Sequence, residues 1–216
     1  MRTFTKLFAI AGVALGALIF TDEVFALEAP DALIKRVSQE IIEIARSDKE
    51  IQAGNRQRIL ALVEEKIVPH LDFRRATALT LGRYWRDATP EQQQQLIGEF
   101  STLLIYTYSG AMSLIKDQKL KFLPLRADPA DTEVEVHSQV LLPKRPEPVK
   151  VAYRLYKSPD GWKIYDVNVL GVWLSETYKG SFSAIINESG IDGLIQVLSD
   201  KNKKRIAADG GEKSKP

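Results

Sequence analysis

Residues 119–178 contain four runs in which apolar and polar side chains alternate, and this pattern constrains the fold most. The runs begin near Leu120, Val134, Val149 and Lys163. Because successive side chains of a strand point to opposite faces, alternation predicts strands with one apolar and one polar face. The connections are short and rich in Pro, Asp and Gly, which favours hairpins. The sequence therefore predicts a four-stranded antiparallel sheet whose apolar face needs a cover.

Segments with helical periodicity flank this sheet and can cover it. We expect helices over 30–53, 56–68, 73–81 and 90–115 before the sheet, and over 175–187 and 191–198 after it. The clearest start is at Thr89, an N-cap residue followed by Pro90 at the first helical position. Ser189 and Gly190 predict a break between the last two helices. The expected fold class is α+β, with helices wrapped on an antiparallel sheet.

The first 26 residues have the pattern of a secretory signal peptide. Arg2 and Lys6 precede an uncharged run over 7–20, and the segment ends Val-Phe-Ala. The apolar run is shorter than the roughly 20 residues that span a bilayer, so we predict cleavage after Ala26 rather than a membrane anchor. One domain is then expected over 27–199. The Lys-rich segment 200–216 is predicted to be a disordered tail.

Charge and residue content argue against several classes of function. The net charge of +2 argues against a protein that binds nucleic acid along its phosphates. With no cysteine, the chain folds without disulfides and has no thiol chemistry. Combined with the signal-peptide pattern, this indicates a bacterial periplasmic protein. His70 and His137 are not at metal-ligand spacing, and no Gly-rich phosphate loop is present, so we expect no metal and no cofactor.

Asp166 raises one enzyme hypothesis. A carboxylate in an apolar pocket beside Tyr108 or Tyr153 can act as a base in an isomerase-like reaction, because burial raises its pKa. Alternatively, Asp166 pairs with Arg154 or Lys163, or caps a backbone group. We favour the structural alternative, since perturbed carboxylates are as often structural as catalytic. The sequence therefore predicts no catalytic residue.

The apolar face of the sheet and the helix over 90–115 carry many medium-sized side chains, most of them valines and leucines. A core built to be filled would use more large aromatic residues there. A permanent void costs about 20–30 cal/mol per Å³, so a cavity in this position implies a ligand. An ordinary valine-rich core is the alternative.

Several stretches, in order along the chain, resemble the MlaC / toluene-tolerance family of periplasmic phospholipid-binding proteins. They are 82–92 (Gly-Arg-Tyr-Trp-Arg-Asp and onward), 107–111 (Thr-Tyr-Ser-Gly-Ala), 162–172 (Trp-Lys-Ile-Tyr-Asp-Val and onward) and 187–194 (Asn-Glu-Ser-Gly and onward). The resemblance covers nearly the whole mature chain. Trp173 departs from the family pattern, in which a smaller residue is expected, and can narrow the mouth of a pocket.

The resemblance implies a cone similar to nuclear transport factor 2, enclosing a deep apolar cavity for the acyl chains of a glycerophospholipid. The function it implies is carriage of phospholipid between the outer and inner membranes, which maintains outer-membrane lipid asymmetry. The implied partners are an inner-membrane ABC transporter with an MCE-domain ring and an outer-membrane lipoprotein–porin complex. A monomer with lipid as cargo, and no enzyme activity, is expected. A periplasmic lipoprotein chaperone and the isomerase-like enzyme are the alternatives.

Alternation and helical spacing, rather than the family, select the residues expected to contact lipid. They are Leu104, Tyr108, Val136, Val140, Val149, Val151, Tyr153, Val167, Val169, Trp173, Tyr178 and Phe182. A register error of one residue would move the whole set of a strand to the other face.

Overall fold

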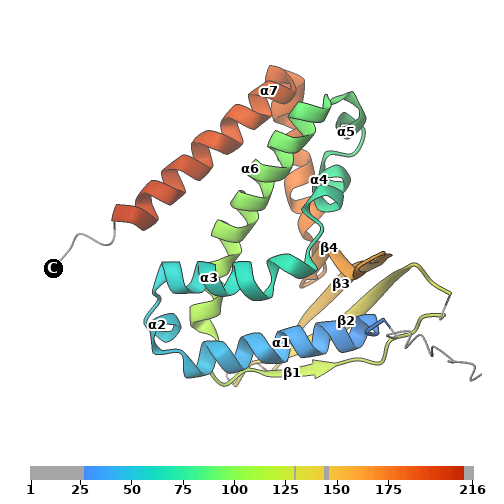
Figure 1. Cartoon of the computed structure of the whole chain (residues 1–216), viewed down its shortest axis with the longest axis vertical. Coiled ribbons are helices and arrows are strands. Elements are labelled where there is room, and N and C mark those ends of the chain that lie inside the picture. The colour runs from blue at the N-terminus through green and yellow to red at the C-terminus, as the bar shows by residue number, and fades with distance from the viewer. Residues whose placement is uncertain (1–26, 129, 144–145, 212–216) are drawn as a thin grey trace, which may run out of the picture.

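The computed structural model describes residues 27–128, 130–143 and 146–211, so the predicted signal peptide lies outside the described residues. The architecture is α+β, with helices on one face of an antiparallel sheet (Figure 1). The helices are α1 (Pro30–Ser47), α2 (Lys49–Gln52), α3 (Arg56–Lys66), α4 (Phe73–Leu81), α5 (Tyr84–Asp87), α6 (Pro90–Tyr108) and α7 (Leu174–Gly211). Two 3₁₀ turns, η1 (Val68–His70) and η2 (Ser109–Leu114), follow α3 and α6.

The sheet has five strands in sequence order: β1 (Lys119–Phe122), β2 (Glu133–Leu141), β3 (Val149–Ser158), β4 (Gly161–Val169) and β5 (Val172–Trp173). The predicted number of four is therefore wrong, because the chain reverses at Leu170 and Gly171, both with positive φ, and adds β5. The sheet is open, so the cone is not confirmed. The predicted antiparallel pairing is confirmed, and Val136, Tyr153 and Val167 lie side by side across three strands.

α1 covers part of the apolar face of the sheet (Figure 1). Its buried side chains recur at helical spacing, and they pack against Val136, Leu155 and Ile164. The predicted helix over 30–53 is interrupted at Asp48, whose carboxylate caps the short helix α2 by accepting from the backbone N–H groups of Glu50 and Ile51. This packing forms the first core, between α1 and the sheet.

A second core lies between α6 and α7, at the far end of the molecule from β1 (Figure 1). α6 begins with the predicted Thr89 cap, and Gln92 completes a capping box with it. The α-helix ends at Tyr108 rather than near residue 115, and η2 continues it as a tighter turn. Phe100 packs edge-to-face against Tyr178 and Phe182, with ring centroids 5.2 Å apart in both pairs.

Over residues 200–211 the structure differs from the prediction of a disordered tail, and the rest of that tail, 212–216, lies outside the described residues. α7 bends at Gly190, as predicted, with φ 72° and ψ −178°, but it then continues to Gly211. Asn202 Nδ2 donates to the Glu99 carbonyl oxygen at 2.8 Å, and Arg56 pairs with Asp209 at 2.8 Å. Polar composition suggested disorder, but these contacts with α6 and α3 order residues 200–211. None of the helices in the described ranges is long and apolar enough to cross a membrane.

Candidate functional site

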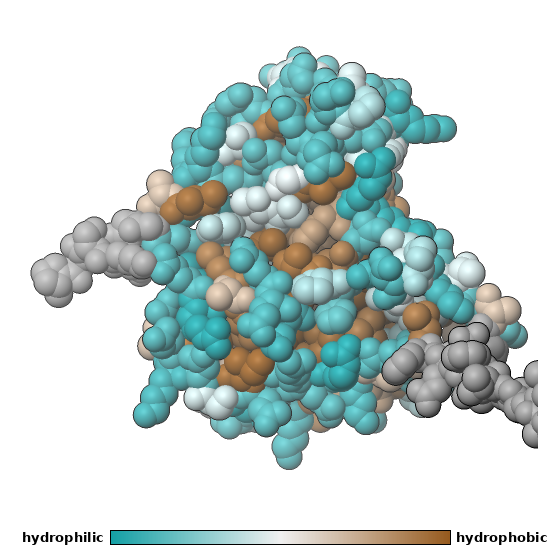
Figure 2. Space-filling view, in the orientation of Figure 1, coloured by the Kyte–Doolittle hydropathy of each residue, from teal (hydrophilic) through white to brown (hydrophobic). Residues whose placement is uncertain are grey.

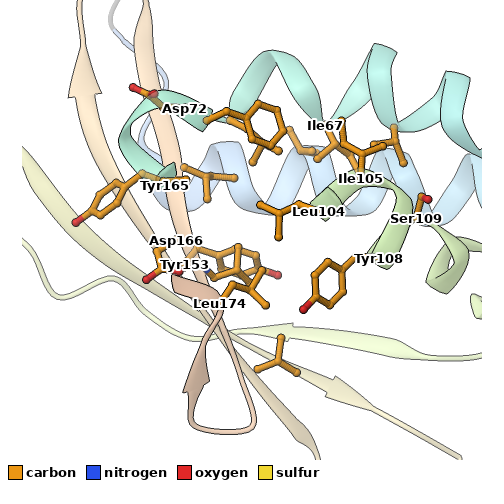
Figure 3. Close-up of a pocket in the computed structure, with 18 of the residues that line it drawn as sticks. Ile67, Asp72, Leu104, Ile105, Tyr108, Ser109, Tyr153, Tyr165, Asp166 and Leu174 are labelled. Atoms are coloured by element: carbon orange, nitrogen blue, oxygen red, sulfur yellow. Dashed lines mark hydrogen bonds between the residues drawn. The ribbon is translucent and has the colours of Figure 1, made fainter. Parts of the chain in front are cut away.

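An apolar cavity of about 430 Å³ lies between the two cores (Figure 3). Its walls come from α1, α3, α4, α6, η2, β3, β4 and the start of α7. Leu104 of α6 lies near the centre, on the side of Tyr153 of the sheet, and Ile105 lies on the side of Ile67 (Figure 3). Ligand pockets usually measure about 300–1,000 Å³, so the cavity is large enough for a sizeable apolar molecule.

The cavity exists because its walls belong to separately packed cores. Phe100 packs with α7, whereas Ile34 and Ile164 pack between α1 and the sheet, and all three line the cavity. Each core buries its apolar side chains without closing the space between them. The void therefore does not require either core to be loosely packed.

The mouth of the cavity lies where α6 and β4 end. Among the described lining residues, only Tyr108, Ala111 and Val169 are exposed. Tyr108 and Val169 are each 41% exposed. Figure 2 shows apolar side chains gathered in a hollow across the middle of the molecule. Two more exposed apolar side chains follow Val169: Leu170 in the β4–β5 turn and Val172 at the start of β5. The rim is therefore apolar as well as the interior.

The two carboxylates on the cavity wall are bonded to protein groups. Asp166 is buried, and its Oδ2 accepts from Ser175 Oγ at 2.6 Å while its Oδ1 accepts from the Ser175 N–H at 3.1 Å. The Arg154 guanidinium lies 3.5 Å from Asp166 Oδ2. Asp72 accepts from the Tyr156 hydroxyl at 2.5 Å. This arrangement matches the structural alternative for Asp166, which caps the start of α7.

Outside the cavity wall formed by Tyr165, a polar cluster joins α4 to the sheet. The guanidinium of Arg75 lies 4.4 Å from the ring centroids of both Tyr156 and Tyr165 and also pairs with Glu133. The hydrogen bond from Arg75 holds the pKa of Glu133 below its ordinary value. Cation–π contacts and this ion pair therefore hold the outer side of the wall.

Tyrosine hydroxyls are the main polar groups near the cavity centre and mouth. The hydroxyls of Tyr108 and Tyr178 are 3.5 Å apart, and burial raises the pKa of Tyr108. Burial likewise raises the pKa of Tyr153. Both hydroxyls are therefore neutral at physiological pH. Among the described lining residues there is no lysine, arginine or histidine.

Five of the residues selected from the sequence line this cavity: Leu104, Tyr108, Tyr153, Val167 and Val169. The structure brings these together from α6, β3 and β4. Their contact with lipid stays a prediction.

The other seven lie outside the cavity lining. Val136 shares a face with Tyr153 but is buried in the core against α1. Tyr178 and Phe182 pack against Phe100. The guanidinium carbon of Arg154 lies 3.7 Å from the centroid of the Trp173 ring. Trp173 is therefore outside the cavity lining, and its narrowing of the mouth stays a prediction. The remaining three, in β2 and β3, are Val140, Val149 and Val151.

Sequence reasoning missed most of the lining from the helices. Ile34, Val37, Ser38 and Ile41 of α1 line the cavity, as do Val63 and Ile67 near the end of α3, and Ser109 and Met112 of η2. The signal for α1 was present, since its apolar side chains recur at helical spacing. Periodicity identifies the inward face of a helix but does not say whether that face meets a core or a void.

Comparisons with known proteins agree with this geometry. The family model for MlaC protein matches residues 35–200. The intermembrane phospholipid transport system binding protein MlaC of Haemophilus influenzae is 20% identical over 203 residues, which are 93% of this chain and 95% of that protein. A solved structure of a phospholipid-binding protein from Ralstonia solanacearum, in complex with a phospholipid, is 42% identical, with a TM-score of 0.75. The match covers 82% of this chain and 98% of that one.

Proposed function

Because the chain belongs to the MlaC protein family, we propose that it binds a glycerophospholipid in the apolar cavity and carries it between membranes. The observation that carries this proposal is the cavity of about 430 Å³, apolar inside and at its rim. The phospholipid complex of the relative from Ralstonia solanacearum supports the same class of ligand.

The energetics explain why a carrier is needed. Two acyl chains of about 15 methylenes each would cost roughly 24 kcal/mol to expose to water. In a bilayer the chains are already away from water, so a protein cavity need only match the membrane interior. Exchange between carrier and bilayer then takes place near equilibrium, and contacts with a partner protein can set its direction.

The cellular setting is part of the proposal. The signal-peptide pattern over 1–26 supports a periplasmic location. We place the protein between an outer-membrane lipoprotein–porin complex and an inner-membrane ABC transporter with an MCE-domain ring. Transport from the outer to the inner membrane, which would maintain outer-membrane lipid asymmetry, follows from the family resemblance.

An enzyme is less well supported than a carrier. The relatives are described as phospholipid-binding and transport proteins. Asp166, the base of the isomerase-like hypothesis, accepts two hydrogen bonds from Ser175 and is held by them at the start of α7. No contact among the described residues favours a lipoprotein chaperone over a phospholipid carrier.

Native mass spectrometry of the protein purified from cells tests the proposal. We expect bound phospholipid in the protein ions and phospholipid in an organic extract. After delipidation, added phospholipid should raise the melting temperature, because a ligand that binds only the folded state stabilises it. An empty extract together with no thermal stabilisation by any phospholipid would overturn the proposal.

A further inference from the structure

Ser109 is a buried hydroxyl on the cavity wall with no hydrogen-bond partner in the described structure. It is 3% exposed, lines the cavity, and its Oγ makes no hydrogen bond to the protein. Figure 3 shows Ser109 where α6 ends, with its side chain directed to a different side from the ring of Tyr108. A buried hydroxyl that has lost water without gaining a partner is costly, so such a group calls for an explanation.

Neighbouring hydroxyls in the same segment behave differently. Ser101 donates to the Gly98 carbonyl oxygen at 2.9 Å, Thr107 to that of Leu103 at 2.5 Å, and Ser113 to that of Gly110 at 2.9 Å. Each thus satisfies its hydroxyl within the preceding turn, as serine and threonine commonly do in helices. Ser109 alone among these four leaves its hydroxyl without a backbone acceptor, so the hydroxyl is available to a guest in the cavity.

The position of Ser109 restricts which part of a phospholipid reaches it. Tyr108 and Ala111 are exposed residues of the lining and flank Ser109 in the chain, so its buried hydroxyl lies within one turn of the mouth. The described lining carries no cationic side chain to compensate a phosphate, which therefore stays outside in water. With the phosphate outside and the acyl chains inside, the carboxylic ester groups lie at the boundary between them.

We propose that Ser109 Oγ donates a hydrogen bond to an ester carbonyl oxygen of the bound lipid and so sets how deeply the lipid enters. The proposal rests on the proposed function and extends it to a ligand class, lipids whose chains are joined by carboxylic esters. An ether-linked lipid has the same chains and head group but lacks the carbonyl acceptor. It would leave the hydroxyl of Ser109 unpaired.

Competition between diester and diether phosphatidylethanolamine with matched chains tests this proposal on the delipidated mature protein. Native mass spectrometry would give the ratio of the two bound lipids. One hydrogen bond predicts that the wild-type protein prefers the diester about 3- to 10-fold. Ser109→Ala should bring this ratio close to that of the lipids offered. Ser113→Ala, whose hydroxyl is used within η2, should keep the wild-type preference.

The infrared band of a ¹³C-labelled ester carbonyl gives a second readout. A hydrogen bond from Ser109 should lower the frequency of this carbonyl band in the wild-type complex. In Ser109→Ala the band should return to the higher frequency of a carbonyl without that hydrogen bond. If Ser109→Ala does not fold, Ser109→Cys, which carries a weaker donor, should reduce both effects.

Each outcome is decisive. Equal binding of both lipids by the wild-type protein, or an unchanged preference and carbonyl band in the folded variants, would overturn the role of Ser109 and leave the carrier function standing. Failure of the wild-type protein to bind either lipid would overturn the carrier function and this inference together.

Discussion

The carboxylate of Asp166 accepts the hydroxyl hydrogen of Ser175, with 2.6 Å between the two oxygens, and so ties β4 to the first turn of α7. Both residues line the cavity and both are buried. The pair therefore holds two walls of the cavity in a fixed relation.

Asp166→Ala should lower the free energy of unfolding by about 1–3 kcal/mol, because it leaves the buried Ser175 groups without their acceptor. Urea denaturation measures this change. Glu188→Ala, at an exposed position of α7, is the control and should have little effect. Equal stability of the wild-type protein and Asp166→Ala would show that the pair does not stabilise the fold.

Leu104→Trp should reduce the amount of phospholipid that co-purifies, because the larger side chain would occupy the centre of the cavity (Figure 3). Overpacking is also expected to lower the free energy of unfolding by about 1–3 kcal/mol. Stability should therefore be measured alongside the lipid content of an organic extract. Leu114→Trp adds the same volume at a side chain that is 68% exposed, and should retain lipid. A folded Leu104→Trp variant with wild-type lipid content would contradict the assignment of the cavity.

The pair formed by Glu133 and Arg75 should contribute to stability at neutral pH and not in acid. Arg75 holds the pKa of Glu133 below its ordinary value of 4.5, so the contribution is present above that value. It is lost as the pH falls through the lowered pKa and the carboxylate is protonated. Glu133→Gln should therefore cost stability at pH 7 but not at pH 2.

The expected loss at pH 7 is below about 1 kcal/mol, because the carboxylate is largely exposed and solvent screens the pair. Chemical denaturation at both pH values gives the comparison. If the difference in free energy of unfolding between wild type and Glu133→Gln is the same at pH 7 and pH 2, titration of this pair is excluded as its source.

Gly190→Ala should destabilise the protein by about 1–3 kcal/mol, since φ 72° with ψ −178° is a conformation available essentially only to glycine. Gly98→Ala is a suitable control. Gly98 lies inside α6, and no atom outside the helix lies within 4 Å of the Cβ that alanine would add. The free energy of unfolding of Gly98→Ala should rise by up to about 1 kcal/mol, because alanine has the higher helix propensity. Melting curves of both variants would show opposite shifts, and a shift of the same sign would contradict the strain at Gly190.

Asn202→Ala should lower the free energy of unfolding by about 1–2 kcal/mol, because Asn202 Nδ2 donates to both the backbone carbonyl and the carboxylate of Glu99. Lys203→Ala, at an exposed neighbouring position, should cost little. Hydrogen exchange over 200–211 supplies a direct check, since these amides should be protected if the helix packs on α6. Rapid exchange there would restore the prediction of a disordered tail.

Local patterns predicted the elements whose causes are local. Thr89 and Pro90 mark the start of α6, and Ser189 and Gly190 mark the bend in α7, because caps and left-handed glycines act within one turn of chain. Alternation likewise placed Tyr153 and Val167 on the inner face of the sheet, since side-chain direction in a strand follows from its pleat. The α+β class and the hairpin order of the strands follow from these local signals.

Tertiary structure alone decided which inward residues meet a cavity. Val136 and Tyr153 share one face of the sheet, yet α1 covers Val136 while Tyr153 lines the cavity. Whether an inward residue meets a core or the cavity depends on the distance between the first core, under α1, and the second core, between α6 and α7. No periodicity in the sequence encodes that distance. The helix over 200–211 is a similar case, because the order of its polar residues comes from partners in α3 and α6, about 100 to 150 residues earlier in the chain. The unpaired hydroxyl of Ser109 also becomes visible only when its neighbours in space are known.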